Sequence, residues 1–458
     1  MLLVVRGKSI FVVAPLCAAA TAALSGADPV ATMTGPYMSG FADYVRNFYL
    51  VFVLGAAFGK LYEDSGAAAT IADRVSGWLG RRRACLAVVL ACAVLTYGGV
   101  SLFVVGFSVH PLAVRLFRAA DLPRRFIPAA IAFGSITFTM TSAGSPEIQN
   151  LIPIKYLIDE VTRQPLTDAL AGWPVSLIVG TLMFAAGQTY LDRAIGRAVV
   201  AGERWEDRPR DGADELPAGR QRPGLLAACG PLIVTLAALN AAPAVGRWIA
   251  AAWPVGADPH WLHARLHASC GNIPEDPAFS IFLGVVTAVI GFRRHVTSGW
   301  ACLGEGFMNG LLAIGATSSV VAFGAAMKEL PAFQQIVSWV TRMPGDPLLA
   351  AAVAVAVISA VAGSASGGQG IALPIIKPIF VDTLGVAPRA LHRVVAISSG
   401  TLDSLPSNGY LVMLIRTICG ETHEQAYRPI FVTTVLIPLL GTGLAIALFK
   451  LVPAWGRM

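Results

Sequence analysis

Charge is scarce in this chain. Of its 458 residues, 13% are Asp, Glu, Lys or Arg, whereas 55% belong to the hydrophobic set. Soluble domains average about 25% charged residues, and a soluble chain of this length would need charged surfaces on about two or three domains. The low charge content excludes an ordinary soluble enzyme, a disordered chain and a protein that binds nucleic acid through a solvated basic face. A polytopic membrane protein remains.

Several motifs of soluble chemistry are also missing. The sequence contains no P-loop lysine motif, no GxGxxG unit, no nucleophile elbow and no HExxH. Its seven cysteines form no CxxC pair and are interpreted as small packing residues. We therefore expect no ATP-driven transport and no cofactor. His260, His263, His267 and Cys270 would share one helix face, but we expect no metal there, because the segment has the pattern of an external loop.

The charges that are present gather between apolar runs. The densest cluster, residues 191–223, holds seven acidic residues and seven arginines among scattered Gly and Pro, which predicts a solvated linker. Four parts are expected: a first transmembrane repeat (1–190), a charged cytoplasmic linker (191–223), a connecting helix with an external loop (224–277) and a second transmembrane repeat (278–458).

Two uncharged runs are too long for one transmembrane helix. Ala84–Val114 would measure about 46 Å as a helix, against a hydrocarbon core of about 30 Å. Arginines flank it on both sides, which places both of its ends on the cytoplasmic side. A segment that enters and leaves on one side is a re-entrant hairpin. Pro347–Ile376 repeats the pattern around glycine-rich residues 363–370. For each run, one long kinked helix is the alternative.

Each predicted hairpin is followed by an apolar span that a polar stretch interrupts, at residues 139–150 and 398–409. Both breaks contain Ser, Thr, Gly, Pro, Asn and one carboxylate. Counting crossings from a cytoplasmic N-terminus gives the two halves opposite orientations. The predicted fold is an all-α polytopic membrane protein with two inverted-topology repeats, each containing a re-entrant hairpin and a broken transmembrane helix. This architecture is typical of secondary transporters.

The tips and breaks are expected to meet in a polar pocket at the bilayer centre. Broken helices leave free N–H and carbonyl groups, which attract anions and cations respectively. The predicted substrate-binding residues are neutral hydroxyls and amides: Ser101, Thr141, Ser142, Ser145, Gln149, Asn150, Ser364, Ser366, Gln369, Thr401, Ser407 and Asn408. Glycines that would let backbone approach a ligand are Gly98, Gly99, Gly144, Gly363, Gly367, Gly368 and Gly400. Alternatively, these polar side chains only satisfy unwound backbone.

Glu147 and Asp403 are the two carboxylates of the breaks. A charge at mid-membrane costs about 2.5–3.5 kcal/mol on insertion scales, and desolvation favours the neutral form of a carboxyl group. Either residue could therefore carry a proton, which predicts proton coupling. The alternative is that one or both lie near the interface or cap a half-helix.

The residues just described resemble the gluconate permease family of proton symporters, within the ion transporter superfamily. Residues 55–66, 363–370 and 397–409 carry the resemblance. It implies uptake of a small organic anion with protons, by a multi-pass protein of the cell inner membrane that forms a homodimer. The first break departs from the Pro/His-rich pattern of gluconate-type members, so another hydroxy- or short-chain carboxylate, or a dicarboxylate, fits as well as gluconate.

Three other functions stay open at this point. The first is a sodium-coupled di- or tricarboxylate transporter of the same architecture, in which tip carbonyls with Ser and Asn would hold the ion. The second is a membrane-embedded enzyme, which is disfavoured because no nucleophile–base pair stands out. The third is a channel, which is disfavoured because closed glycine-rich tips favour alternating access.

Overall fold

A computed structural model describes residues 10–79, 83–100, 102–207, 222–252, 277–328, 346–362, 364–406 and 408–457. Within these ranges the regular elements are helices, and the one β-bridge is an isolated pair between Ile158 and Pro165. Four described helical segments are long and apolar enough to cross a membrane, namely Pro29–Ser65, Trp173–Val200, Gly299–Met327 and His423–Leu451. The all-α membrane-protein class is therefore confirmed.

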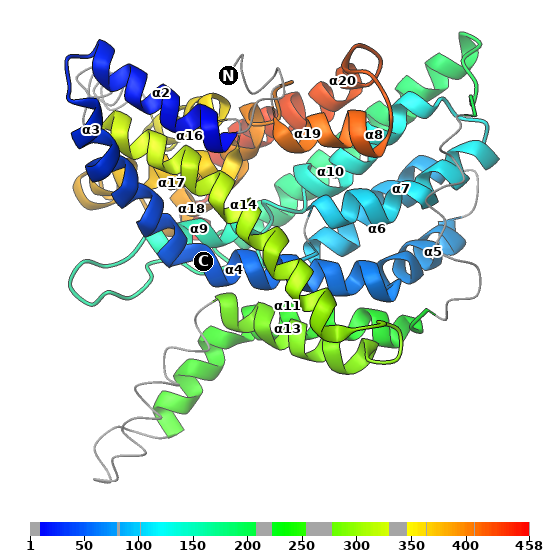
Figure 1. Cartoon of the computed structure of the whole chain (residues 1–458), viewed down its shortest axis with the longest axis horizontal. Coiled ribbons are helices and arrows are strands. Elements are labelled where there is room, and N and C mark those ends of the chain that lie inside the picture. Colours follow the sequence, from blue (N-terminus) through cyan, green and yellow to red (C-terminus); the bar gives the residue numbers. More distant parts are fainter. Residues whose placement is uncertain are drawn as a thin grey trace.

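Each half of the chain contains, in the same order, a long helix, a helical hairpin and an interrupted helix (Figure 1). The first half contains α2 (Ile10–Leu24), α3 (Pro29–Thr32), η1 (Met33–Tyr37), α4 (Met38–Ser65), α5 (Ala67–Leu79), α6 (Ala84–Tyr97), α7 (Leu102–Ala119), η3 (Arg124–Phe126), α8 (Ile127–Ala132), η4 (Phe133–Thr137), α9 (Ile148–Tyr156) and α10 (Trp173–Val200). After α11 (Leu225–Ala252) come α13 (Pro277–Phe292), α14 (Gly299–Lys328), α16 (Pro347–Ala362), α17 (Ala365–Ile376), η5 (Lys377–Thr383), α18 (Pro388–Leu402), α19 (Gly409–Met413), η6 (Leu414–Ile418), α20 (His423–Phe431), η7 (Val432–Leu436), α21 (Ile437–Leu451) and η8 (Pro453–Arg457).

Helices α4 and α14 share the most extensive helix–helix contact among the described elements. A Cβ added to Gly306 would lie 2.5 Å from Ala57 Cα, and one added to Gly310 would lie 2.5 Å from Val53 Cα. Residue numbers rise along one helix as they fall along the other, so the pair is antiparallel. Small residues allow this backbone approach. Because α4 and α14 occupy equivalent places in the two halves, their opposite directions are consistent with the predicted inversion.

Both predicted hairpins are present. Helices α6 and α7 pack against each other, as do α16 and α17. The first reversal uses Gly99 at φ +94, a conformation that disfavours any side chain. In the second hairpin, a Cβ on Gly368 would lie 2.5 Å from Ser359 Cα, so its two arms contact through backbone. The alternative of one long kinked helix is wrong for both runs.

Both predicted broken helices are also present. Helical structure stops at Thr137 and resumes at Ile148 in the first, and it stops at Leu402 and resumes at Gly409 in the second. Hydroxyl groups near the first break bond helix carbonyls, as in the 2.7 Å bond from Ser135 Oγ to Ile131 O. Such bonds compete with the regular helix ladder, and they accompany the π-helical turn η4.

Helix α10 continues to Val200, past the predicted boundary at residue 190. Leu191, Ile195 and Ala198 are buried along this extension. Their i, i+4, i+7 spacing places them on one helix face. The sequence-based prediction missed this apolar stripe because charged residues are dense around it. The first part of the predicted linker is therefore the end of a helix.

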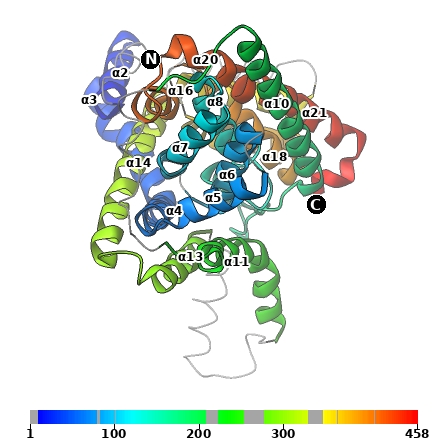
Figure 2. The ribbon, with the colours of Figure 1, turned by 90° about the vertical axis from the view of Figure 1, so that its right-hand side faces the viewer.

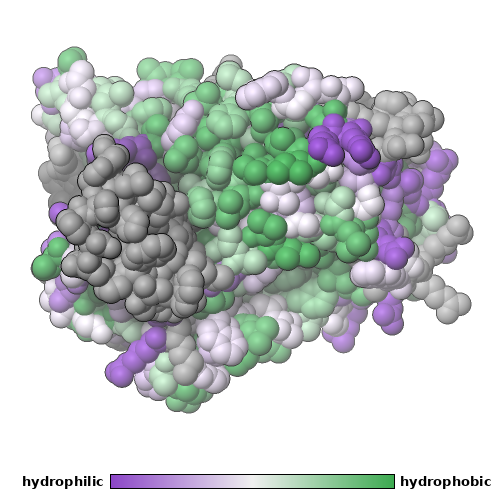
Figure 3. Space-filling view, turned by 90° about the horizontal axis from the view of Figure 1, so that it is seen from below, coloured by the Kyte–Doolittle hydropathy of each residue, from purple (hydrophilic) through white to green (hydrophobic). Residues whose placement is uncertain are grey.

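The outside of the molecule carries large apolar side chains. Leu16, Leu177, Leu182 and Leu440 are each more than half exposed. Apolar residues extend over much of the face in Figure 3, whereas hydrophilic residues gather mainly toward its edges. Such a surface suits helices that face lipid.

In Figure 2, α11 and α13 lie below α4 and α5, whereas α10, α18 and α21 lie to the right of the hairpin α6–α7.

Candidate functional site

A cavity of about 630 Å³ lies where both breaks meet the tips of both hairpins. Helices α2, α4 and α14 form much of its wall, and the breaks and tips supply the rest. Seven of the residues predicted to form the site line this cavity: Gly99, Glu147, Gln149, Ser364, Ser366, Asp403 and Asn408. No Lys or Arg is found among the described residues of the lining.

Glu147 occupies the N-cap position of α9, directly after Pro146. Its residue is only 9% exposed, and its backbone N–H donates to Ser145 Oγ at 3.3 Å. In the described part of the chain, no hydrogen bond or ion pair engages its carboxylate. A buried carboxylate without a donor is costly when ionised.

Asp403 follows α18 and is held more firmly. Ser404 Oγ donates to Asp403 Oδ1 at 3.0 Å, and the backbone N–H of Ala365, at the start of α17, also faces this carboxylate. Asn408 Nδ2 donates to the Asp403 backbone oxygen at 3.1 Å. The second break and the second hairpin tip therefore meet at this side chain.

The remaining lining residues organise the helix ends. Ser364 caps α17 by accepting from Gly367 N at 3.2 Å and lies 3.1 Å from Ser366 Oγ. Asn408 Oδ1 caps α19 by accepting from Leu411 N at 3.0 Å. Gln149 lines the cavity, and its Oε1 is buried without a donor among the described residues.

Other predicted residues lie outside the lining and bond mainly to backbone oxygens. Thr141 Oγ1 donates to Thr137 O at 3.4 Å, Ser142 Oγ donates to Phe138 O, and Thr401 Oγ1 donates to Ser398 O at 2.5 Å. Gln369 Nε2 donates to Gln149 O at 3.1 Å and to Ser399 Oγ at 2.7 Å. Gly98, Gly144, Ser145, Asn150, Gly367, Gly368 and Gly400 also lie outside the lining.

A third group of predicted residues cannot be placed. Ser101, Ser407 and Gly363 lie outside the described residues, as do His260, His263, His267 and Cys270. Within the described ranges, no group of three or more His, Cys, Asp or Glu side chains could hold a metal ion.

Sequence reasoning missed Arg393, a fully buried arginine on α18. Its guanidinium donates to Ala171 O at 2.9 Å, to Thr141 O at 2.5 Å and to Asn150 Oδ1 at 3.0 Å. These acceptors belong to the first break and to the segment that leads into α10. The available signal was a cation four residues after Arg389, next to His392 and directly before an apolar run.

Two ion pairs connect the broken helices reciprocally. Arg124, at the start of the first, lies 3.2 Å from Glu421, which follows the second, and both side chains are buried. Arg389, at the start of the second, pairs with Asp168, which follows the first. The start of each broken helix is thus attached to the segment that follows the other broken helix.

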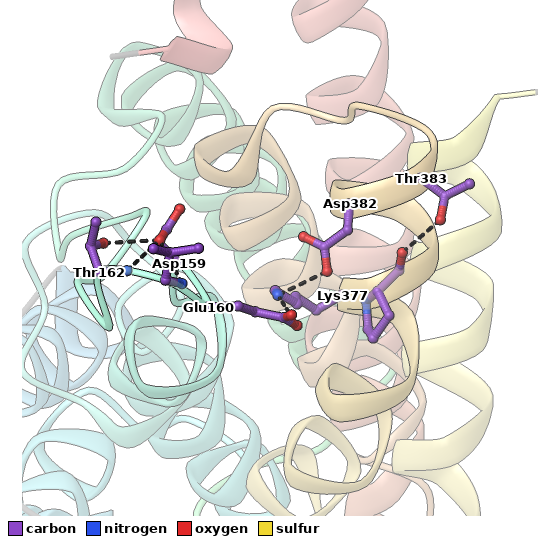
Figure 4. A network of polar contacts seen from close by, with 8 residues as sticks. Asp159, Glu160, Thr162, Lys377, Asp382 and Thr383 are labelled. Carbon is purple, nitrogen blue, oxygen red and sulfur yellow. Dashed lines mark hydrogen bonds and ion pairs between the residues drawn. The ribbon is translucent and has the colours of Figure 1, made fainter.

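A further polar network joins the loop after α9 to the second hairpin (Figure 4). Lys377 Nζ lies 2.9 Å from Glu160 Oε1 and 2.8 Å from Asp382 Oδ2. In the same loop, hydrogen bonds from the backbone and side chain of Thr162 lower the pKa of Asp159. The loop that leaves the first break is therefore attached to the helix that leaves the second tip.

Comparison with known proteins identifies the family to which the chain belongs. Residues 1–452 match the profile of the family described as GntP family permease. The chain belongs to this family of permeases. This permease is 33% identical over 468 residues to a Bacillus subtilis (strain 168) protein called uncharacterized transporter YxjC, covering 97% of this chain and 95% of that protein. A Haemophilus influenzae protein called an uncharacterized transporter is 25% identical over 164 residues, or 36% of this chain and 39% of that one.

The fold of the permease also resembles a solved structure. The crystal structure of the Alcanivorax borkumensis YdaH transporter, described as having an unusual topology, superposes with a TM-score of 0.57. The match covers 97% of this chain and 98% of that one at 16% identity. This likeness concerns the fold alone. Family membership and the apolar helices together make the permease an integral membrane transporter.

Proposed function

We propose that this permease is a secondary active transporter that takes up a small organic anion together with protons. In this mechanism Glu147 and Asp403 bind protons from the side to which the cavity is open, and the anion binds once their negative charge is neutralised. The helix starts and hydroxyls at the tips and breaks then hold its carboxylate. When the cavity opens to the other side of the membrane, the anion and the protons are released.

The observation that carries the proposal is the shared position of the two carboxylates. Glu147 comes from the first break and Asp403 from the second, yet both line one cavity and both are more than nine-tenths buried. No Lys or Arg in the described lining compensates them. An anion can enter such a site at low cost only if protons enter with it.

The test is uptake into proteoliposomes that contain the purified permease. Labelled gluconate and other small carboxylates would be screened under an inwardly directed proton gradient. We expect at least one of them to accumulate. A proton ionophore should abolish the accumulation, and protein-free liposomes provide the background. Accumulation that follows a sodium gradient and ignores pH would contradict proton coupling.

A sodium-coupled di- or tricarboxylate transporter is the second candidate. Its support is the pair of buried amide oxygens, Gln149 Oε1 and Gln369 Oε1, for which the described residues supply no donor. Oxygen atoms without donors suit a hard cation. The same liposomes, with a sodium gradient at equal pH on both sides, separate the two candidates.

The setting of the protein is part of the proposal. We infer an inner-membrane location with a cytoplasmic N-terminus and a cytoplasmic linker, on the basis of the arginine-rich flanks of the first hairpin. We also infer a homodimer, which the family resemblance implies. Cross-linking in native membranes would test the dimer.

A further inference from the structure

We propose that the substrate of this permease is a monocarboxylic acid with an apolar tail, not a polyhydroxylated acid or a dicarboxylate. The inference rests on the proposed transport function and narrows its substrate class. It follows from what the cavity wall contains and from which polar groups are already occupied.

Charge limits the substrate to one carboxylate. The cavity holds Glu147 and Asp403, and no Lys or Arg lies among its described lining residues. Protonation of these two groups can neutralise their charge, but it supplies no positive partner for the ligand. A monocarboxylate must therefore be held by neutral donors alone, and a dicarboxylate would bring a second charge without a counter-charge into the same low-dielectric site, which is strongly unfavourable.

The wall that α4 and α14 form is mostly apolar. Helix α4 contributes Val51 and Phe52, and α14 contributes Ala316, Val320 and Phe323. Thr317 also lines the cavity from α14, and its hydroxyl donates to Ala313 O at 3.1 Å. These side chains belong to the antiparallel pair α4–α14, whose close contact fixes the wall. An apolar tail would bury its surface against them and gain affinity with each carbon.

Hydroxyl groups on a ligand would find few partners. Thr141, Ser142 and Thr401 lie outside the cavity lining and donate to backbone oxygens. Ser364 and Asn408, which do line it, already accept backbone N–H groups in the first turns of α17 and α19. Gln149 Oε1 remains in the lining as an acceptor for which the described residues supply no donor. A substrate with several hydroxyls would leave some of them against Val320 or Phe323, where an unpaired polar group is costly.

Chain length provides the sharpest test. Binding of acetate, propanoate, butanoate and pentanoate to the purified full-length permease would be measured by titration calorimetry at pH 5.5. We expect Kd to fall about fourfold with each added methylene, the gain for burying one CH₂. Gluconate and succinate, measured in the same way, should bind more weakly than pentanoate.

A matched pair of variants tests whether the wall is responsible. Val320→Thr adds a hydroxyl to the cavity wall, whereas Val357→Thr makes the same change at a position that is 43% exposed and outside the lining. Val320→Thr should raise the Kd of pentanoate about fivefold and leave that of acetate unchanged. Val357→Thr should change neither. A loss of folding would affect both acids equally, so the split between them identifies the wall.

The outcomes are distinct. A Kd that falls along the series, with weak gluconate and succinate, supports the inference. Tighter binding of gluconate or succinate than of butanoate overturns it and leaves the proposed proton-coupled transport intact. If no acid binds and neither gluconate nor succinate accumulates in liposomes under a proton gradient, both this inference and the proposed function fail.

Discussion

At the scale of single residues, Glu147 and Asp403 differ in what surrounds them. The Asp403 carboxylate accepts from Ser404 Oγ at 3.0 Å and faces the start of α17, whereas no described group donates to the carboxylate of Glu147. Hydrogen bonds to the charged form stabilise it. The two residues are therefore not equivalent, because only Asp403 has described donors for its carboxylate.

Replacing each carboxylate tests its role in proton coupling. In Asp403→Asn and Glu147→Gln, uptake driven by a proton gradient should fall to the level of protein-free liposomes, because the neutral side chain cannot release a proton. Exchange of labelled for unlabelled substrate, which requires no net proton movement, should persist. Asp43→Asn removes an exposed carboxylate on α4 that pairs with Arg46 and should transport normally. Unchanged pH dependence in either cavity variant would refute the role of that residue.

Arg393 is expected to be required for stability. Arg393→Met would leave the oxygens of Ala171 and Thr141 and the side-chain oxygen of Asn150 without this donor. Since each buried acceptor left unpaired costs about 1–3 kcal/mol, the free energy of unfolding should fall by about 3 kcal/mol or more. Arg393→Lys, which keeps the charge but not the planar fork, should have an intermediate effect.

The measurement is thermal unfolding of the detergent-solubilised protein. Arg46→Met provides the control, because this side chain is 74% exposed and forms an ordinary surface pair worth about 0–1 kcal/mol. Equal melting temperatures for Arg393→Met and Arg46→Met would show that the buried network contributes little.

At the scale of helices, the contact between α4 and α14 depends on glycine at particular positions. Gly306→Ala and Gly310→Ala would each place a Cβ 2.5 Å from backbone Cα atoms of α4, so the helices must move apart. We expect a loss of about 1–3 kcal/mol in the free energy of unfolding, typical of overpacking.

Gly304→Ala is the matched control on the same helix, because its added Cβ would meet no atom within 4 Å. Alanine is the better helix former by about 0.5–1 kcal/mol, so this variant should melt at the same or a higher temperature. If all three variants behave alike, close packing of α4 on α14 is not what stabilises the pair.

The elements could be predicted because their signals are local. An uncharged run of excess length, glycines at its centre and arginines on both flanks are all properties of one segment. Which hydroxyl faces the cavity could not be predicted, since Thr141 and Ser364 have similar chemistry and differ only in how tertiary packing turns them. Arg393 was missed for a related reason. Its acceptors, such as Ala171, lie in the other half of the chain.

At the scale of the whole molecule, ion pairs connect the end of α10 to the first hairpin. Arg125 donates to both carboxylate oxygens of Glu203, at 2.7 and 2.8 Å, and these bonds lower the pKa of Glu203. Arg118 lies 3.1 Å from Asp207. The beginning of the linker and the arginine-rich flank of the hairpin are therefore on the same side of the protein.

The loop after α9 should lie on the opposite side. Helix α10 has 28 residues and measures about 42 Å, which exceeds the hydrocarbon core of about 30 Å. Thr162 and Glu206 are exposed in the segments before and after it. If the arginine-rich side is cytoplasmic, then Thr162 faces outward and Glu206 faces the cytoplasm.

Cysteine labelling in intact cells would establish this orientation. A membrane-impermeant maleimide should label Thr162→Cys in intact cells and label Glu206→Cys only after the membrane is opened. The described native cysteines are buried or half-buried, and the unsubstituted protein measures their background. Labelling in the reverse order would contradict the inference that the N-terminus is cytoplasmic. It would still show that α10 crosses the membrane. Labelling of both positions from outside would mean that α10 does not cross the membrane, which would remove the basis for two inverted halves.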